Sequence, residues 1–463
     1  PIMKTHRMLC LMLLAWAVAS LTAWADEPFR KHRYDAFRMT PPPEGSIIML
    51  GNSITDMHPW VEAFRTASGR PLPIVNRGNS GTVAPEQLAN LESYLVHSPA
   101  KVFVMIGTND IATNGLNATP EQVLTQVQAI ASRIHLRSPK TKVYLQPVLN
   151  NRTGNRSAER WLRINEMLKA YVRDTGASWL SYVDIYDTLT DIASGGVWSF
   201  DGLHLTAASY RKWCEALLPY MQEGLNEKVF TVYPAEAASL QQDGGIGRNS
   251  NGMRATYVSL LPITKDDILF FGDEEVKCGE WNELLGTPFV KNRGTGWGWG
   301  GTIALTSKMA DATFATVSGV EKATPRAILL YTGTSDVHGS TEMATVQANY
   351  LALVNRLKSL APGARLYLVG LHPVGNATTN AQRIAPFNAY LRSLAGGQVS
   401  YIDLCTDMTA TDGTALTTSV PAGQNYLYGT GYARMARVIA EALKADFPTL
   451  SLHTPSDGDG ALR

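Results

Sequence analysis

Four short motifs contain residues whose types suit chemistry on an ester. Ser53 ends the run Gly51-Asn52-Ser53, Gly81 ends the run 76–81, Asn109 lies in the run 107–110, and the run 201–204 begins with Asp201 and ends with His204. A serine hydroxyl becomes a good nucleophile when a neighbouring base takes its proton, and that base must be oriented by a third group. The oxygen that becomes negative needs N–H donors already in place. Together these residue types predict acyl transfer.

Each motif has a definite role in that chemistry. Ser53 is the predicted nucleophile, and Asp201 is expected to hold the imidazole of His204, whose other nitrogen faces Ser53. The backbone N–H groups of Ser53 and Gly81 and the side-chain amide of Asn109 are the predicted oxyanion donors. One such motif alone is typical of a turn or a helix cap, but four in this order, each after a predicted strand or before a helix, indicate an esterase. No His, Cys and carboxylate group has the spacing of metal ligands, so we expect no metal and no cofactor.

The elements that must position these motifs occur twice. In order along the chain, residues 46–53 match 267–274, 74–78 match 290–294, 102–110 match 328–336, 143–145 match 366–368, and 182–185 match 401–404. Several matches in one order indicate tandem copies of a single domain.

Each copy alternates short apolar runs with amphipathic helical patterns, which in the first copy cover 121–136 and 161–172. Continuous apolar strands between amphipathic helices are typical of a parallel sheet covered on both faces. We therefore predict two α/β domains, each a three-layer α/β/α sandwich with a flavodoxin-like parallel sheet. The reactive groups should lie at the carboxyl ends of the strands.

The chain divides into five predicted segments. Residues 1–25 have a basic start, an apolar run from Met8 to Leu21 and a small-residue site at 23–25, so we expect a signal peptide cleaved near Ala25 and a periplasmic or secreted protein. Residues 26–222 form the predicted catalytic domain and 266–448 the second domain. The Gly- and polar-rich stretch 241–252 indicates a linker over 223–265, and 449–463 is the predicted flexible tail. After residue 25 no segment is long and apolar enough to insert into a membrane.

The second copy retains the strands but not the reactive groups. Glu274 stands at the position of Ser53, Ser335 at that of Asn109, and residues 424–428 replace the Asp201–His204 motif. This domain is therefore expected to be catalytically dead. Its loop 296–301 carries Trp297 and Trp299, which are candidate substrate-binding residues because indole faces suit sugar rings. The alternative is that both tryptophans pack under the loop or against the first domain.

The four motifs resemble conserved blocks of the SGNH (GDSL-like) serine esterases over residues 46–220. The resemblance implies Ser53 as nucleophile, Asp201 and His204 as its partners, and Ser53, Gly81 and Asn109 as the oxyanion hole. Asn52 replaces the aspartate of the GDS-type members, at a position with no catalytic role. The whole chain is more loosely similar to the two-domain sialate O-acetylesterases of bacteria.

The predicted substrate is an acetylated glycan. A formal net charge of +1 without a run of like charges gives no electrostatic case for nucleic acid. The favoured sugar is an O-acetylated sialic acid, whose carboxylate Arg77 is a candidate to bind. Three further arginines after the fourth strand are candidates for the same role: Arg152, Arg156 and Arg160. Acetylated plant polysaccharides such as xylan, and a glycan-binding protein without catalysis, remain alternatives. No feature of the sequence specifies an oligomeric state or a disulfide.

Overall fold

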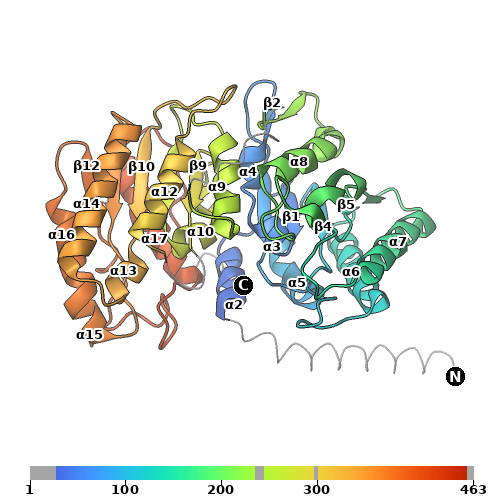
Figure 1. The fold of residues 1–463 in the computed structure, drawn as a ribbon, viewed down its shortest axis with the longest axis horizontal. Helices are drawn as coiled ribbons and strands as arrows, with labels where there is room; N and C mark the ends of the chain where they lie inside the picture. Colours follow the sequence, from blue (N-terminus) through green and yellow to red (C-terminus); the bar gives the residue numbers. More distant parts are fainter. Residues whose placement is uncertain (1–27, 235–244, 297–300, 456–463) are drawn as a thin grey trace.

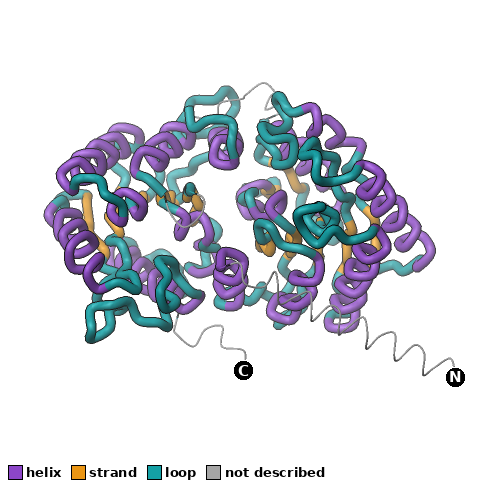
Figure 2. The backbone as a smooth tube through the Cα atoms, turned by 60° about the horizontal axis from the view of Figure 1, so that its bottom comes forward, coloured by secondary structure: helices purple, strands orange, loops and turns teal. Residues whose placement is uncertain are grey.

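Two α/β domains lie side by side in the computed structural model (Figure 1), which describes residues 28–234, 245–296 and 301–455. The predicted signal peptide, Trp297, Trp299, the middle of the predicted linker and the end of the predicted tail lie outside these residues. In both domains the strands lie between helices (Figure 2), which confirms the predicted three-layer architecture.

The first domain contains a five-stranded parallel sheet in the order β3-β1-β4-β5-β6. Every residue of the edge strand β3 and of the next two strands, β1 and β4, is buried, as expected for strands covered on both faces. The strand bounds are β1 Ile47–Gly51, β3 Ile74–Gly78, β4 Lys101–Met105, β5 Lys142–Leu145 and β6 Leu180–Tyr182.

Helices cover both faces of this sheet. The predicted helices at 121–136 and 161–172 are confirmed as α6 and α7. The start of α6 is fixed by Thr119, which caps the helix in a reciprocal pair of hydrogen bonds with Gln122, and by the proline that follows it. The helices are α2 Pro28–Arg38, α3 Ser53–Asp56, α4 Trp60–Ala63, α5 Ala84–Asn90, η1 Leu91–Tyr94, α6 Pro120–Arg137, α7 Ala158–Thr175, η2 Asp187–Ser194 and α8 Ala207–Gln222.

The second domain repeats this plan with the parallel sheet β9-β8-β10-β11-β12. The edge pairs correspond, because Gly51 pairs with Gly78 in one sheet and Gly272 with Gly294 in the other. Its strands are β8 Ile268–Gly272, β9 Val290–Gly294, β10 Ala327–Tyr331, β11 Arg365–Val369 and β12 Val399–Ile402, and its helices are α9 Ser250–Leu260, α10 Glu274–Cys278, α11 Trp281–Leu284, α12 Ile303–Thr313, α13 Thr334–His338, α14 Met343–Leu360, α15 Ala377–Thr379, η4 Asn380–Ile384, α16 Ala385–Ser393 and α17 Gly429–Asp446.

The prediction that 223–265 is only a linker is wrong. Strand β7 (Val229–Thr231) pairs antiparallel with β2 (Phe64–Thr66), and helix α9 follows it. The side chains of Met253, Tyr257 and Leu260 in α9 are buried. The Gly-rich stretch before α9 dominates the composition of the segment, so the short apolar helix that follows was not recognised from the sequence.

The two domains meet through reciprocal contacts. Arg77 of β3 forms a two-bonded ion pair with Glu283 of the second domain, at 3.1 and 2.7 Å. Arg293 of β9 forms the matching pair with Glu62 of the first domain, at 2.7 and 2.8 Å. Since the two arginines occupy the same place in their domains, as do the two glutamates, the interface has the form of a two-fold dimer built within one chain.

In the part of the chain that the structure describes, no helix is long and apolar enough to cross a membrane. The cysteines in it, Cys214, Cys278 and Cys405, are free thiols.

Candidate active site

The turn after β1 presents Ser53 at the first position of α3. The Asn52 side chain accepts a hydrogen bond of 3.0 Å from the Ile54 N–H and so caps this short helix. Gly51 is required there, because a Cβ atom would lie 2.3 Å from Thr55 Oγ1 and 2.5 Å from the carbonyl oxygen of Met105. The tight turn therefore fixes the Ser53 hydroxyl at the carboxyl end of the sheet.

Ser53, His204 and Asp201 form one chain of hydrogen bonds, as the motif spacing predicts. His204 Nδ1 donates to Asp201 Oδ2 at 2.7 Å, and Ser53 Oγ donates to His204 Nε2 at 2.8 Å. Asp201 is the residue that selects this tautomer, because its carboxylate requires the proton on Nδ1. The free lone pair of Nε2 is then directed at the serine hydroxyl.

The Asp201 carboxylate is itself held by its surroundings. Its Oδ1 accepts the backbone N–H groups of Leu203 and His204 at 2.9 and 2.8 Å. Burial opposes ionisation of this carboxyl, but the hydrogen bonds and the charge of His204, together with these backbone donors, lower its pKa well below the usual range. Asp201 is therefore a carboxylate throughout the neutral range.

Three loops that carry candidate oxyanion donors are tied together. The Asn79 N–H donates to the Gly51 carbonyl at 3.1 Å, and Asn109 Nδ2 donates to the Thr82 carbonyl at 2.9 Å. Within the described residues, no acceptor takes a hydrogen bond from the backbone N–H of Ser53 or Gly81. Two backbone donors and the second N–H of the Asn109 amide are thus available to a ligand at this end of the sheet.

Arg156 orients the Asn109 amide, a role that sequence reasoning missed. Its Nη2 donates to Asn109 Oδ1 at 3.0 Å, and its Nε donates to the Thr108 carbonyl at 2.8 Å. A guanidinium on the amide oxygen fixes the NH₂ group on the opposite side and polarises it. The sequence named Arg156 only as a candidate for a substrate carboxylate.

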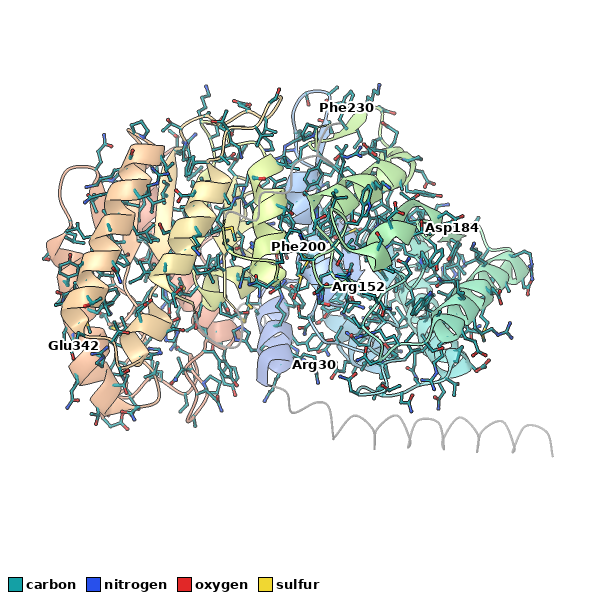
Figure 3. All side chains as sticks on the ribbon, in the orientation of Figure 1. Arg30, Arg152, Asp184, Phe200, Phe230 and Glu342 are labelled. Carbon is teal, nitrogen blue, oxygen red and sulfur yellow. The ribbon has the colours of Figure 1, made fainter. Side chains whose placement is uncertain are left out.

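Arg152 and Phe200 lie together beside this site (Figure 3). Arg152 Nη2 donates to the Phe200 carbonyl at 3.2 Å, and its side chain covers Gly202, where a Cβ atom would lie 2.0 Å from Arg152 Cγ. Arg248 lies with its guanidinium carbon 4.8 Å from the centre of the Phe200 ring. Both arginines are exposed, so the edge next to Asp201 is cationic.

The other sequence-predicted binding residues do not join this group. Arg77 is fully buried between the domains, where it pairs with Glu283, so its prediction as a substrate ligand is wrong. Its guanidinium also donates to the Thr40 carbonyl, so its described partners are all within the domain interface and the first domain. Arg160 bonds the Asn117 side chain and the Ile111 carbonyl. Trp297 and Trp299 lie outside the described residues.

The corresponding end of the second sheet lacks the triad. Glu274, 1% exposed, takes the place of Ser53 and pairs with Lys277 at 3.2 Å. Gly423 and Tyr426 precede α17 where Asp201 and His204 precede α8. This arrangement has neither a hydroxyl nucleophile nor an imidazole base at those positions.

What the first site can do chemically follows from these groups. A serine hydroxyl bonded to an imidazole, which is bonded to a carboxylate, can attack a carbonyl carbon, and the nearby N–H groups can stabilise the oxygen that becomes negative. No group of three or more His, Cys, Asp or Glu in the described ranges is arranged to hold a metal ion.

Comparisons with known proteins agree with this geometry. The model of the GDSL-like Lipase/Acylhydrolase family matches residues 49–212 and again 279–434, which together make up more than half of the chain. The platelet-activating factor acetylhydrolase IB subunit alpha2 of Rattus norvegicus is 25% identical over 196 residues, which are 41% of this chain and 83% of that protein.

Two solved structures are also similar. A GDSL-like lipase from Bacteroides thetaiotaomicron has a TM-score of 0.33 at 21% identity and covers 42% of this chain and 100% of its own. A carbohydrate esterase family 3 protein from Talaromyces cellulolyticus has a TM-score of 0.31 at 16% identity, with coverage of 38% and 95%.

Proposed function

The chain belongs to the GDSL-like lipase/acylhydrolase family, and on that premise we propose that it is a carbohydrate O-acetylesterase whose nucleophile is Ser53. The observation that carries the proposal is the chain of hydrogen bonds from Ser53 through His204 to Asp201, at 2.8 and 2.7 Å. The second domain contributes no catalytic group to this reaction.

The reaction proceeds in two halves. Ser53 Oγ attacks the acyl carbon while His204 Nε2 takes the hydroxyl proton, and the carbonyl oxygen becomes negative beside the N–H groups of Ser53, Gly81 and Asn109. His204 then gives the proton to the departing alcohol, which leaves an acetyl ester on Ser53. Water, deprotonated by His204, attacks this ester, and acetate leaves as Ser53 regains its proton. Asp201 stays ionised throughout and stabilises the imidazolium.

Two features support an acetylated acidic sugar as substrate. The curated relative is by name an acetylhydrolase, which favours acetyl over longer acyl groups. The exposed guanidinium groups of Arg152 and Arg248 flank Phe200 next to Asp201, a pairing that suits a sugar ring bearing a carboxylate. An O-acetylated sialic acid carries both an acetyl ester and a carboxylate, whereas acetylated xylan offers no carboxylate at the acetylated residue.

A substrate panel tests this proposal. Acetate release is measured on O-acetylated sialic acids, on acetylated xylan and on p-nitrophenyl acetate, for the wild type and for an Arg152→Ala/Arg248→Ala double variant. We expect kcat/KM on the sialate to fall about tenfold or more in the variant, because a charged hydrogen bond is lost. The value of kcat/KM on p-nitrophenyl acetate should not change. Equal activity of wild type and variant on the sialate contradicts the acidic sugar. No turnover of p-nitrophenyl acetate by the wild type makes the protein a glycan-binding module instead.

A further inference from the structure

Helix α2 lies between the two domains (Figure 1) and contacts both. On one side, His32 Nδ1 donates to the Leu427 carbonyl at 2.6 Å, and Tyr432 donates to His32 Nε2 at 3.0 Å. These two partners belong to the second domain, at the start of α17. Helix α2 of the first domain is therefore packed on helix α17 of the second domain.

The other side of α2 holds the loop that supplies the Gly81 donor, residues 79–82, which we call the oxyanion loop. The Arg30 carbonyl accepts from Asn79 Nδ2 at 2.9 Å, and the Tyr34 hydroxyl bonds the Thr82 hydroxyl. Asn79 and Thr82 are fully buried, so these bonds are shielded from water. The loop is thus fastened at both ends to one helix.

Arg33 links the second domain to the middle of this loop. Its guanidinium, buried at 2% exposure, donates to the Cys278 carbonyl and to Glu280 Oε1 at 2.6 Å, both in the second domain. It also donates to Asp56 Oδ1 at 2.9 Å. Asp56 Oδ2 in turn accepts the Ser80 N–H at 3.1 Å and the Ser80 hydroxyl. The peptide that follows Ser80 carries the Gly81 N–H.

The two copies share the carbonyl contact of Arg33 across the domain interface but not its bridge to the oxyanion loop. Arg254 of α9 corresponds to Arg33 of α2, and it donates to the Met57 carbonyl as Arg33 does to the Cys278 carbonyl. That reciprocal pair belongs to the interface itself. The link is one-sided: Lys277 stands in the second domain at the position of Asp56, and Pro59 stands in the first at the position of Glu280. The carboxylate bridge exists only where a nucleophile exists.

We propose that the second domain, acting through Glu280, Arg33 and Asp56, positions the oxyanion loop of the first domain. Asp56 is a positioning residue in this scheme, since it touches the loop and not the substrate. The inference rests on the proposed function. It gives the catalytically dead copy a role in the chemical step of its neighbour.

Asp56→Asn tests the link with little change of volume. The asparagine retains one oxygen for Arg33 but turns an NH₂ group toward the Ser80 N–H, which loses its acceptor. We expect kcat on p-nitrophenyl acetate to fall about tenfold to a hundredfold, as small misplacements at a reacting centre do, with KM changed less than about threefold. Glu280→Gln, a change in the other domain, is expected to lower kcat in the same sense by about threefold.

The matched control is Glu62→Gln. It weakens an interface ion pair that is more deeply buried than those of Arg33, and the described contacts of Glu62 and Arg293 include none to the oxyanion loop. It should lower the melting temperature and leave kcat unchanged. Wild-type kcat in both Asp56→Asn and Glu280→Gln, or an equal loss of kcat in Glu62→Gln, overturns the inference. Ser53→Ala, measured in parallel, separates the failures: an inactive Ser53→Ala beside a fully active Asp56→Asn leaves the proposed function intact, whereas an active Ser53→Ala removes both.

Discussion

Replacement of Asn109 by alanine isolates one donor of the proposed oxyanion hole. The amide uses one N–H on the Thr82 carbonyl, at 2.9 Å, and leaves the other for the reacting oxygen. Loss of such a donor costs about 2.7–4 kcal/mol in the barrier, so kcat should fall by about 10²–10³. The lost bond to Thr82 should cost only about 1 kcal/mol of folding free energy. Arg156 keeps its bond to the Thr108 carbonyl, so no buried charge is left without a partner.

The assay is steady-state hydrolysis of p-nitrophenyl acetate, together with a thermal melt. Because the bond strengthens as the oxygen becomes negative, KM should change little while kcat falls. A rise in KM at unchanged kcat refutes the reasoning, since it makes Asn109 a ligand of the ground state. A loss of activity that follows a large drop in melting temperature refutes it as well, because the Asn109 side chain makes only two hydrogen bonds within the described residues, one to the Thr82 carbonyl and one from Arg156.

Two further predictions concern the electrostatics, one at Arg156 and one at Asp273. Arg156→Met should lower kcat about tenfold by releasing the Asn109 amide, while Arg160→Met, a neighbour bonded to Asn117, should keep wild-type kcat; equal values for the two variants contradict the role of Arg156. Burial raises the pKa of Asp273 to about 7, against about 3.9 in an unfolded chain, so the folded state holds this proton more tightly. The contribution of protonated Asp273 to the free energy of unfolding is therefore full below pH ~4 and is lost as the pH rises through about 7. Asp273→Asn places an asparagine where the first domain has Asn52. It should flatten the fall in the urea midpoint of the second domain between pH 5 and 8. An unchanged slope would exclude Asp273 as the source of this pH dependence.

The sequence was sufficient to predict the fold and the proximity of Ser53, Asp201 and His204, because both depend on local patterns. Strand runs such as 47–51 are apolar without interruption, and Ser53, Asp201 and His204 sit at fixed distances from the ends of elements. A parallel sheet brings those ends together whatever the rest of the chain does. The match of the family model to two regions confirms the predicted duplication.

The interface was not predictable in the same way. Arg77 adjoins Gly78 in the run 76–81, and its sequence position is compatible both with the site and with a buried pair to Glu283. Only the packing of the second domain decides between them. The same holds for Arg33 and Asp56, whose partners are separated from them along the chain. Helix α9 was missed because a Gly-rich stretch precedes it and dominates the composition of the segment.

The most direct test of the central claim is the hydrolysis of p-nitrophenyl acetate by Ser53→Ala. Ser53 is the only hydroxyl bonded to His204 within the described residues, so its loss should lower kcat by several powers of ten, while the melting temperature stays within a few degrees because Asn52 still caps α3. A folded Ser53→Ala protein that retains more than a few per cent of wild-type kcat would contradict the assignment of the nucleophile and with it the proposed reaction.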